Sequence, residues 1–239
     1  MTGLAENLRG PDDMVEVFDC FGDFGFAAAM TLKGPWRTQS DVYRFVMNNI
    51  LPSGLTLVIP EQVHGSDVIF LGDMAGAFNF KADAVITRRK DICLSVTTAD
   101  CLPLLLADPV SGHFGVVHIG WRSLVTGILD NFMHIALANG MDIAQTRGFS
   151  GPAIGPCCFE VGPEVAALFG KEHQSLKDGS IFVDLRNAVE NELLSLGITK
   201  SNMSGLLECT SCDDKKYYSF RRDRQSPVQM VTFIYKSAV

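Results

Sequence analysis

Two apolar runs that flank a cluster of turn-forming residues constrain the fold more than any other part of the sequence. Leu102–Ala107 and His113–Val117 lie on either side of Asp108-Pro109-Val110-Ser111-Gly112. Asp, Pro, Ser and Gly favour tight turns, so this stretch predicts a β-hairpin. If residues 108–111 form its loop, Cys101 lies directly opposite His118, with Cβ atoms about 4.5–5.5 Å apart. A thiolate and an imidazole at that separation can share a metal ion or form a catalytic pair, although a slip of one residue would turn one side chain to the opposite face.

The hairpin is followed by a predicted anion-binding element. After His118 the chain reads Gly120-Trp121-Arg122-Ser123, and a helix is expected over 123–139. The N–H groups at the start of a helix carry partial positive charge, and the Arg122 guanidinium adds a fork that suits phosphate or carboxylate. Trp121 offers a flat face on which a planar ligand can stack. The sequence therefore predicts a metal site and an anion site within one turn of each other.

His64 is the third candidate metal ligand. It follows the apolar run Leu55–Ile59, at the point where a predicted strand gives way to a turn. One cysteine and two histidines are a known set of protein ligands for catalytic zinc, with a fourth position left for water or substrate. Spacing alone does not link His64 to Cys101 and His118, and the alternative is that all three are buried core residues. For the anion site, the alternative is that Trp121 is a core aromatic residue and Arg122 is an ion-pair partner.

The remaining cysteines form a competing candidate site. Cys209 and Cys212 make a Cys-x-x-Cys pair, and Cys157 and Cys158 are adjacent in the sequence. Four thiolates can hold a structural zinc ion, but adjacent cysteines are poorly placed to bind one tetrahedral ion, and a second Cys-x-x-Cys pair is missing. A redox role for the pair at 209–212 would need a surrounding thioredoxin-like βαβ unit, which the sequence does not predict.

The overall pattern predicts a single α/β domain of the α+β type over 1–239, with a mixed β-sheet core and flanking helices. A chain of 239 residues with 47% hydrophobic side chains can bury a large core, and no repeat or linker divides it. Residues 1–40 are expected to be irregular, because Gly and Pro are scattered among short apolar pieces. The predicted strands are 55–59, 67–71, 84–87, 92–98 and 229–235, and the predicted helices are 41–50 (capped by Ser40), 123–139, 163–169 and 184–196. These elements do not alternate strictly, which favours a mixed sheet over a doubly wound one.

Charge and motif content argue against several classes of function. The formal net charge of −7 argues against a surface that binds nucleic acid, although it leaves room for a local anion site. No run is long and apolar enough to span a membrane, and residues 1–14 lack the apolar core of a signal peptide, so a cytoplasmic location is expected. The seven cysteines are then expected as thiols, metal ligands or core residues rather than as a disulfide framework. Phosphate-loop, dinucleotide-binding, zinc-protease and nucleophile-elbow signatures are absent.

Several ordered motifs resemble those of the YfiH-like laccase-domain family, whose members are also labelled multicopper polyphenol oxidoreductases. The motifs cover roughly residues 55–235 and are Gln62-Val63-His64-Gly65, Ala82–Thr87, Thr98–Pro103, His118–Arg122, Gly151–Gly162, Cys209-Thr210 and Tyr218–Arg222. The resemblance implies a mononuclear zinc ion held by His64, Cys101 and His118, with purine nucleoside phosphorolysis and adenosine deamination as activities. The laccase label implies copper and phenol oxidation as an alternative, but five histidines are few for several copper ions.

The resemblance also sets expectations for the reaction. The three metal ligands and Arg122 are the expected catalytic residues, and the partners are a small nucleoside and phosphate. For deamination, zinc would activate water for attack on the purine C6. For phosphorolysis, phosphate held near Arg122 would attack the ribose C1′ as the base leaves. Glu160 and Asp100 are candidates for protonating the leaving base, because both lie in matched motifs.

Three segments depart from the family pattern. Phe21–Thr31 lacks the Arg and the Asn-Leu that the family carries near its N-terminus, Ile119 replaces a small residue, and Pro227-Val228-Gln229 replaces Thr-Gly-Arg. These changes leave the three metal ligands in place but affect the surrounding substrate shell, so a divergent specificity or a metal-binding protein with little nucleoside activity is an alternative. Two hypotheses from other classes also stay open: a metal-independent hydrolase in which Cys101 is the nucleophile and His118 the base, and a non-catalytic binding protein.

Overall fold

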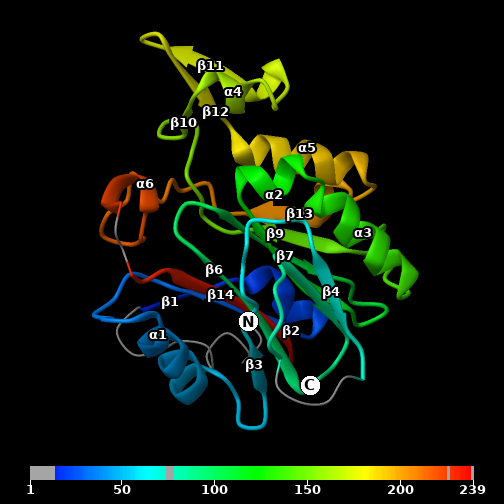
Figure 1. Ribbon diagram of the computed structural model, residues 1–239. Helices are drawn as coiled ribbons and strands as arrows, with labels where there is room; N and C mark the ends of the chain where they lie inside the picture. The colour runs from blue at the N-terminus through cyan, green and yellow to red at the C-terminus, as the bar shows by residue number, and fades with distance from the viewer. Residues whose placement is uncertain (1–13, 74–77, 225–226, 238–239) are drawn as a thin grey trace.

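Two mixed β-sheets stacked face to face form the centre of the molecule (Figure 1). The computed structural model describes residues 14–73, 78–224 and 227–237. One sheet contains, in spatial order, β1 (Val15–Val17), β2 (Phe26–Thr31), β14 (Met230–Lys236), β6 (Ile92–Thr98) and β3 (Thr56–Val58). The other contains β13 (Met203–Gly205), β9 (Arg147–Ser150), β7 (Leu102–Ala107), β8 (Phe114–Ile119), β5 (Ala84–Thr87) and β4 (Val68–Leu71). Parallel pairs occur beside antiparallel ones in both sheets, which confirms the predicted mixed topology.

Helices cover the outer face of the second sheet, as predicted for a fold of the α+β type. They are α2 (Trp121–Val125), α3 (Ile128–Ala138) and α5 (Leu185–Ser195), while α1 (Gln39–Phe45) packs against the first sheet. A small third sheet contains β10 (Glu160–Val161), β12 (Ser180–Val183) and β11 (Gln174–Lys177). Together with α4 (Pro163–Ala166) it projects at the top of Figure 1, above α5, and α6 (Phe220–Asp223) lies to one side.

The hairpin of β7 and β8 is apolar because both of its faces are covered. Leu105 and Ala107 pack toward the first sheet, whereas Leu102, Leu104 and Leu106 pack against the helices. Every residue of the two strands is buried. A strand covered on both faces reads in sequence as a continuous apolar run rather than as an alternating one. A polar side chain in such a strand needs a buried partner.

The predicted register of this hairpin is wrong by two residues. β7 pairs with β8 so that Pro103, not Cys101, lies opposite His118. The loop is longer than expected because the Asp108 N–H donates to the His113 carbonyl at 2.8 Å, while the Asp108 carboxylate accepts N–H bonds inside the turn. Side chains alternate between faces with a period of two, so a two-residue shift leaves Cys101 and His118 on the same face. The prediction that they approach each other therefore survives the wrong register.

Several predicted helix boundaries are also wrong. Helix α1 begins at Gln39, and its cap is Thr38 rather than Ser40, because Thr38 and Asp41 exchange side-chain and backbone bonds in a capping box. The α-helical part ends at Phe45 and continues as a π-helical turn to Ile50. The helix expected over 123–139 is two helices, α2 and α3, separated at Gly127, whose φ of 82° is left-handed. The helix expected over 163–169 ends at Ala166.

The expectation that residues 1–40 are irregular is wrong for the part that the structure describes. The segment Phe26–Thr31 is the fully buried strand β2, which pairs with β1 on one side and β14 on the other. The expectations for residues 1–13, including the missing signal peptide, lie outside the described residues. Across 14–73, 78–224 and 227–237, none of the helices has the length and apolar character that crossing a membrane requires.

Candidate metal centre and its cavity

The three predicted metal ligands converge on one point, and each comes from a different element. His64 lies in the loop between β3 and β4, Cys101 immediately before β7, and His118 near the end of β8. Their ligand atoms all lie within 4.8 Å of one another, and Cys101 Sγ is 3.8 Å from His64 Nε2. The close approach that the hairpin argument predicted for Cys101 and His118 is therefore present, and His64 joins them from a distant part of the sequence.

Asp83 holds this arrangement in place. Its fully buried carboxylate lies 2.7 Å from His118 Nδ1 and accepts N–H bonds from Val63, His64 and Gly65 at 3.1, 2.9 and 2.8 Å. His64 has a left-handed φ of 58°, a conformation that the three amide bonds to Asp83 stabilise. With Nδ1 of His118 bonded to a carboxylate, Nε2 is the ring atom free to bind a metal. Asp83 was not among the residues predicted for the site, although it is a charged residue directly before the apolar strand β5.

The ionisable groups of the cluster stabilise one another's charged forms. Burial raises the pKa of the Cys101 thiol, but hydrogen bonds with His118 and His64 outweigh it and lower the pKa from 9.0 to about 7. Burial lowers the pKa of His118, and the bonds to Asp83 and Cys101 outweigh that effect and raise it from 6.5 to about 9. For Asp83, burial raises the pKa, and the bond from His118 together with the backbone N–H groups lowers it overall. The Cys101 thiolate and the Asp83 carboxylate thus favour the protonated form of His118, and a metal ion bound by these ligands would displace that proton.

A side chain at Gly120 would crowd the ligands where the backbone passes them. A Cβ at this position would lie 3.0 Å from His64 Cδ2 and 3.2 Å from Cys101 Sγ. Its φ of −86° is accessible to any residue, so the constraint is the space beside the ligands rather than backbone conformation. The Gly120 N–H donates to Ser123 Oγ at 2.9 Å, which fixes the turn into α2.

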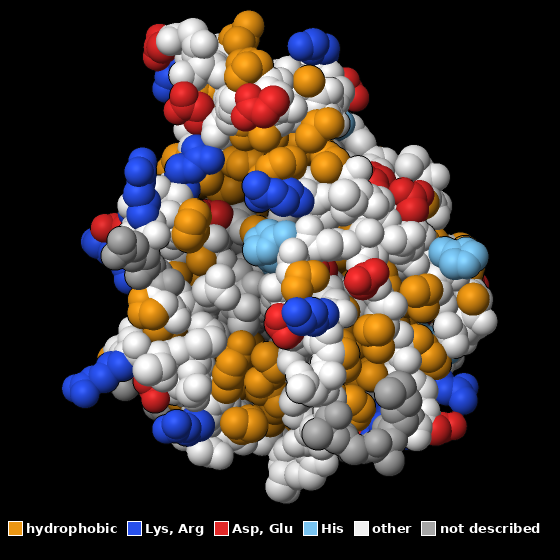
Figure 2. Space-filling model, viewed as in Figure 1, with side chains coloured by type: hydrophobic (Ala, Val, Ile, Leu, Met, Phe, Trp, Pro, Cys, Tyr) orange, Lys and Arg blue, Asp and Glu red, His pale blue; other side chains and the backbone are white. Residues whose placement is uncertain are grey.

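A cavity of about 520 Å³ opens beside the three ligands. This volume lies in the range of about 300–1,000 Å³ typical of small-molecule sites. Figure 2 shows the hollow below the projecting third sheet, with hydrophobic and basic side chains around its mouth. The lining residues are His64, Ala99, Asp100, Cys101, His118, Gly120, Trp121, Arg122, Ile154, Phe159, Leu185, Phe220, Arg221 and Gln229.

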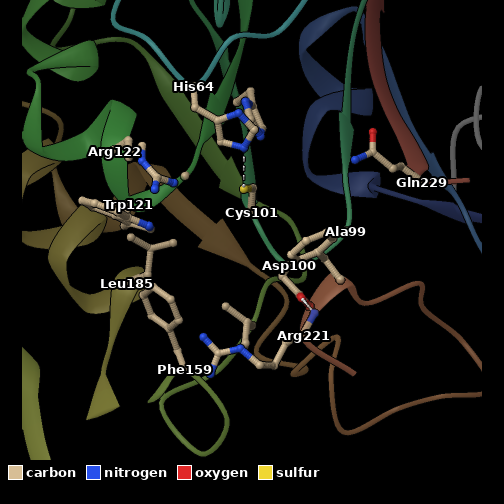
Figure 3. A pocket seen from close by; sticks show the side chains of 14 residues that line it. His64, Ala99, Asp100, Cys101, Trp121, Arg122, Phe159, Leu185, Arg221 and Gln229 are labelled. Carbon is tan, nitrogen blue, oxygen red and sulfur yellow. Dashed lines mark hydrogen bonds between the residues drawn. The ribbon is translucent and has the colours of Figure 1, made fainter. Parts of the chain in front are cut away.

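Trp121 and Arg122 lie on one wall of this cavity, as Figure 3 shows. The Arg122 guanidinium carbon is 4.3 Å from the centre of the Trp121 ring, so the two side chains stack. The start of helix α2 is less suited to binding an anion than the sequence predicted. The helix has five residues, and the N–H of Gly120 is already bonded to Ser123. Anion binding here would depend on the Arg122 side chain.

The two acidic candidates differ in position. Asp100 lines the cavity, but one carboxylate oxygen accepts from Thr210 Oγ1 at 2.7 Å and the other from the Arg221 N–H at 2.6 Å. Its left-handed φ of 95° and these bonds indicate a structural role in the turn before β7. Glu160 is outside the cavity lining, and its carboxylate accepts from Ser180. Neither carboxyl group is therefore arranged as an evident proton donor.

The donor set of the cluster fits zinc. One thiolate and two imidazoles that leave an open side toward a cavity are typical of a catalytic zinc site, and the bond from Asp83 supplies the second layer of support that such ligands require. The other three histidines lie elsewhere, with His113 bonded to Ser111 and His173 to Asn187. The described residues contain two groupings suited to a metal, and neither has the several histidines of a multicopper centre.

The second grouping consists of Cys157, Cys158, Cys209 and Cys212, whose Sγ atoms also lie within 4.8 Å of one another. Such a cluster was disfavoured from the sequence because two of its members are adjacent. The structure brings all four thiols together.

The departures from the family pattern have unequal consequences. Ile119 is fully buried and packs toward the helices, away from the cavity. Phe21–Thr31 contributes a short helical turn and strand β2 to the first sheet, and none of its residues lines the cavity. Gln229 does line the cavity, so the change near the C-terminus alters the surface that a substrate would meet.

Comparisons with known proteins agree with this structure. The profile of the family described as multi-copper polyphenol oxidoreductase laccase matches residues 42–237. The chain is 31% identical over 196 residues, 75% of each protein, to "Adenosine deaminase RL5" from an unknown prokaryotic organism. It is 33% identical over 231 residues to a "Purine nucleoside phosphorylase" of Xylella fastidiosa, covering 91% of this chain and 85% of that protein. Among solved structures, Bacillus licheniformis hypothetical protein YfiH superposes with a TM-score of 0.81 at 24% identity, covering 94% of this chain and 97% of the other.

Proposed function

This chain belongs to the YfiH-like laccase-domain family, and on that premise we propose that it is a metal-dependent enzyme that cleaves purine nucleosides with phosphate and deaminates adenosine. The observation that carries the proposal is the convergence of His64, Cys101 and His118 on one wall of a cavity that also contains Trp121 and Arg122. A metal site, an aromatic face and a cation are the groups that a purine base and phosphate require. A cytoplasmic location remains a prediction.

Zinc is the metal that these residues fit. His64, Cys101 and His118 would hold it, and a zinc ion bound there supplies a Lewis acid that activates water or polarises a substrate atom. Asp83 orients His118 and the His64 loop, so both imidazoles are fixed before any metal binds. Copper, which the laccase label implies, would need further histidines that the cluster does not contain.

The cavity walls suggest how the substrates are held. The indole of Trp121 offers a flat face for the purine, and Arg122 offers two N–H donors to a phosphate oxygen pair. In phosphorolysis a phosphate oxygen bonds to C1′ while the bond from C1′ to the base breaks, and the base departs with the electron pair and takes up a proton. In deamination water adds at C6 of adenosine and ammonia leaves. Arg122 is needed for the first reaction only.

A metal-independent thiol hydrolase is the second candidate. The observation that favours it is the lowered pKa of Cys101, about 7, beside His118. A thiolate next to an imidazole is the usual activated nucleophile of cysteine hydrolases. This reading requires no metal, so it predicts activity that excess chelator leaves intact and iodoacetamide abolishes.

The test is metal analysis combined with turnover of adenosine and inosine, each with and without phosphate. The proposal predicts zinc in the purified protein, turnover that chelator abolishes and added zinc restores, and loss of both turnover and one equivalent of zinc in Cys101→Ala. Unchanged zinc content in Cys101→Ala would refute the assigned ligands. Zinc without turnover of either nucleoside would favour a metal-binding protein in which Gln229 and its neighbours have removed the activity.

A further inference from the structure

Four thiols gather outside the cavity of the candidate metal centre described above. Cys157 and Cys158 lie on the loop between β9 and β10, and Cys209 and Cys212 lie on the loop between β13 and α6. Cys212 Sγ is 3.6 Å from Cys157 Sγ and 3.4 Å from Cys158 Sγ, and all four sulfur atoms lie within 4.8 Å of one another. None of the four lines the cavity beside His64.

The local backbone explains how two adjacent cysteines face one point. Residues 155–159 form a tight turn in which the N–H groups of Cys158 and Phe159 both donate to the Gly155 carbonyl at 2.9 Å. Successive side chains diverge by about 180° in a strand but by only about 100° in a helical turn, so both thiols can point to the same side. Gly155 permits the approach, since a Cβ there would lie 3.2 Å from Cys209 Cβ and 3.3 Å from Cys157 Sγ.

The second loop presents its thiols in a comparable turn. The N–H groups of Cys212 and Asp213 donate to the Cys209 carbonyl at 3.1 and 3.2 Å, which folds the Cys-x-x-Cys segment back on itself. Across the gap, the Gly155 N–H points at Cys209 Sγ, 3.1 Å away. Backbone N–H groups directed at sulfur stabilise a thiolate, the form that binds metal.

We propose that these four cysteines hold a structural zinc ion, in addition to the ion of the catalytic cavity. Zinc bound tetrahedrally at about 2.3 Å from each sulfur separates the sulfur atoms by roughly 3.8 Å. The observed separations of 3.4 and 3.6 Å are close to this value. A disulfide would need about 2.05 Å, and four protein thiolates leave no open position for substrate, as in closed structural sites.

The ion would tie together two loops that carry the cavity wall. The isolated bridge between Ala153 and Cys209 is one existing link between these segments. The Arg221 guanidinium is another, because it donates to the carbonyls of Cys158 and Glu160 at 3.1 and 2.9 Å. Phe159, one residue after the first thiol pair, and Arg221, beyond the second, both line the cavity. Zinc at this position therefore fixes the rim of the cavity without entering it.

The test counts zinc per chain by elemental mass spectrometry in the intact protein, with activity not used as the readout. Two equivalents are expected in the wild type and in Cys20→Ser, a control thiol that belongs to neither group of candidate ligands. One equivalent is expected in Cys101→Ala, one in Cys212→Ser, and none in the double variant. The loss in Cys212→Ser reports on the new site and the loss in Cys101→Ala on the proposed catalytic ion, so failure of either proposal is seen separately.

Cobalt substitution covers the case in which Cys212→Ser does not fold. Cys101→Ala loaded with cobalt should show the intense thiolate charge-transfer absorption of a tetrahedral site with four sulfur ligands. The proposal is overturned if Cys101→Ala contains no zinc and shows no such absorption. It is equally overturned if peptide mapping by mass spectrometry shows that two of the four cysteines are joined by a disulfide.

Discussion

His118 Nδ1 lies 2.7 Å from Asp83 Oδ1, and the same oxygen accepts the N–H of His64 at 2.9 Å. One carboxylate therefore orients both histidines of the metal centre, one through its ring and the other through its backbone. Buried carboxylates are rarely left without several donors, and this one has four. Asp83 is therefore a positioning residue, and weaker metal binding is the main effect expected from its loss.

Asp83→Asn should weaken zinc binding at this centre by about 10–100-fold, the usual cost of losing a carboxylate that supports a ligating histidine. Asparagine keeps the shape, but its single oxygen can replace only one carboxylate oxygen, either the one bonded to Val63 and Gly65 or the one bonded to His64 and His118. The measurement is competition for zinc with a chromophoric chelator, in a Cys212→Ser background so that one site is observed.

The matched control is Asp91→Asn, an exposed carboxylate that pairs with Arg89. Its zinc affinity should equal that of the parent. If Asp83→Asn binds zinc as tightly as Asp91→Asn does, the carboxylate has no role in positioning the ligands.

Gly120→Ala should lower zinc affinity with little loss of fold stability. The added methyl group would press on His64 and Cys101 at 3.0 and 3.2 Å, while the φ of −86° is acceptable for alanine. We expect faster zinc release to a chelator and a thermal midpoint close to that of the wild type. Gly65→Ala is the control, because its Cβ would meet neighbours at 3.5 and 3.7 Å, an ordinary contact distance. Equal release rates in the two variants would contradict the steric argument.

Much of this centre could be predicted from the sequence because its parts are local. Strands β5 and β6 have the predicted bounds, since continuous apolar runs between turn residues specify buried strands. The approach of Cys101 to His118 followed from a hairpin whose faces are set by a period of two. Even the wrong register preserved it, because the error was an even number of residues.

The features that were missed depend on contacts between distant segments. Strand β2 has the sequence Phe-Ala-Ala-Ala-Met-Thr, which lacks β-branched residues except at its end and becomes a strand because β1 and β14 pair with it. Asp83 acquires its role only when β5 brings it beside the His64 loop. The thiol cluster needs a turn at 155–159 that spacing in the sequence does not reveal.

Glu192→Gln should stabilise the fold at alkaline pH and not at acidic pH. Burial, with a contribution from Asp130, raises the pKa of Glu192 from 4.5 to about 7, and its Oε1 has no hydrogen-bond partner among the described residues. As pH rises from 4.5 through 7, the unfolded chain releases this proton first, so the group's contribution to stability falls over that window. Glutamine stays neutral, and a gain of roughly 1–2 kcal/mol is expected at pH 8, reduced for partial exposure.

The measurement is the free energy of unfolding from denaturant titrations at pH 4.5 and pH 8. Glu190→Gln serves as the control, since Glu190 lies on the same helix and pairs with Lys200 at the surface. It should change stability little at either pH. A gain for Glu192→Gln that is the same at both pH values would show that titration of this carboxyl is not the cause.

Arg122→Gln should separate the two proposed reactions. Arg122 lines the cavity and stacks on Trp121 at 4.3 Å, and the described residues show no carboxylate bonded to it, so its N–H donors are available to phosphate. A charge-assisted hydrogen bond is worth about 1.5–3 kcal/mol, so the KM for phosphate in phosphorolysis should rise by roughly 10–150-fold. Deamination, which uses no phosphate, should keep its kcat/KM within about twofold, as should both reactions in the surface control Arg44→Gln. An equal loss in both reactions of Arg122→Gln would instead mean that Arg122 holds the nucleoside, or that it maintains Trp121 in position for both.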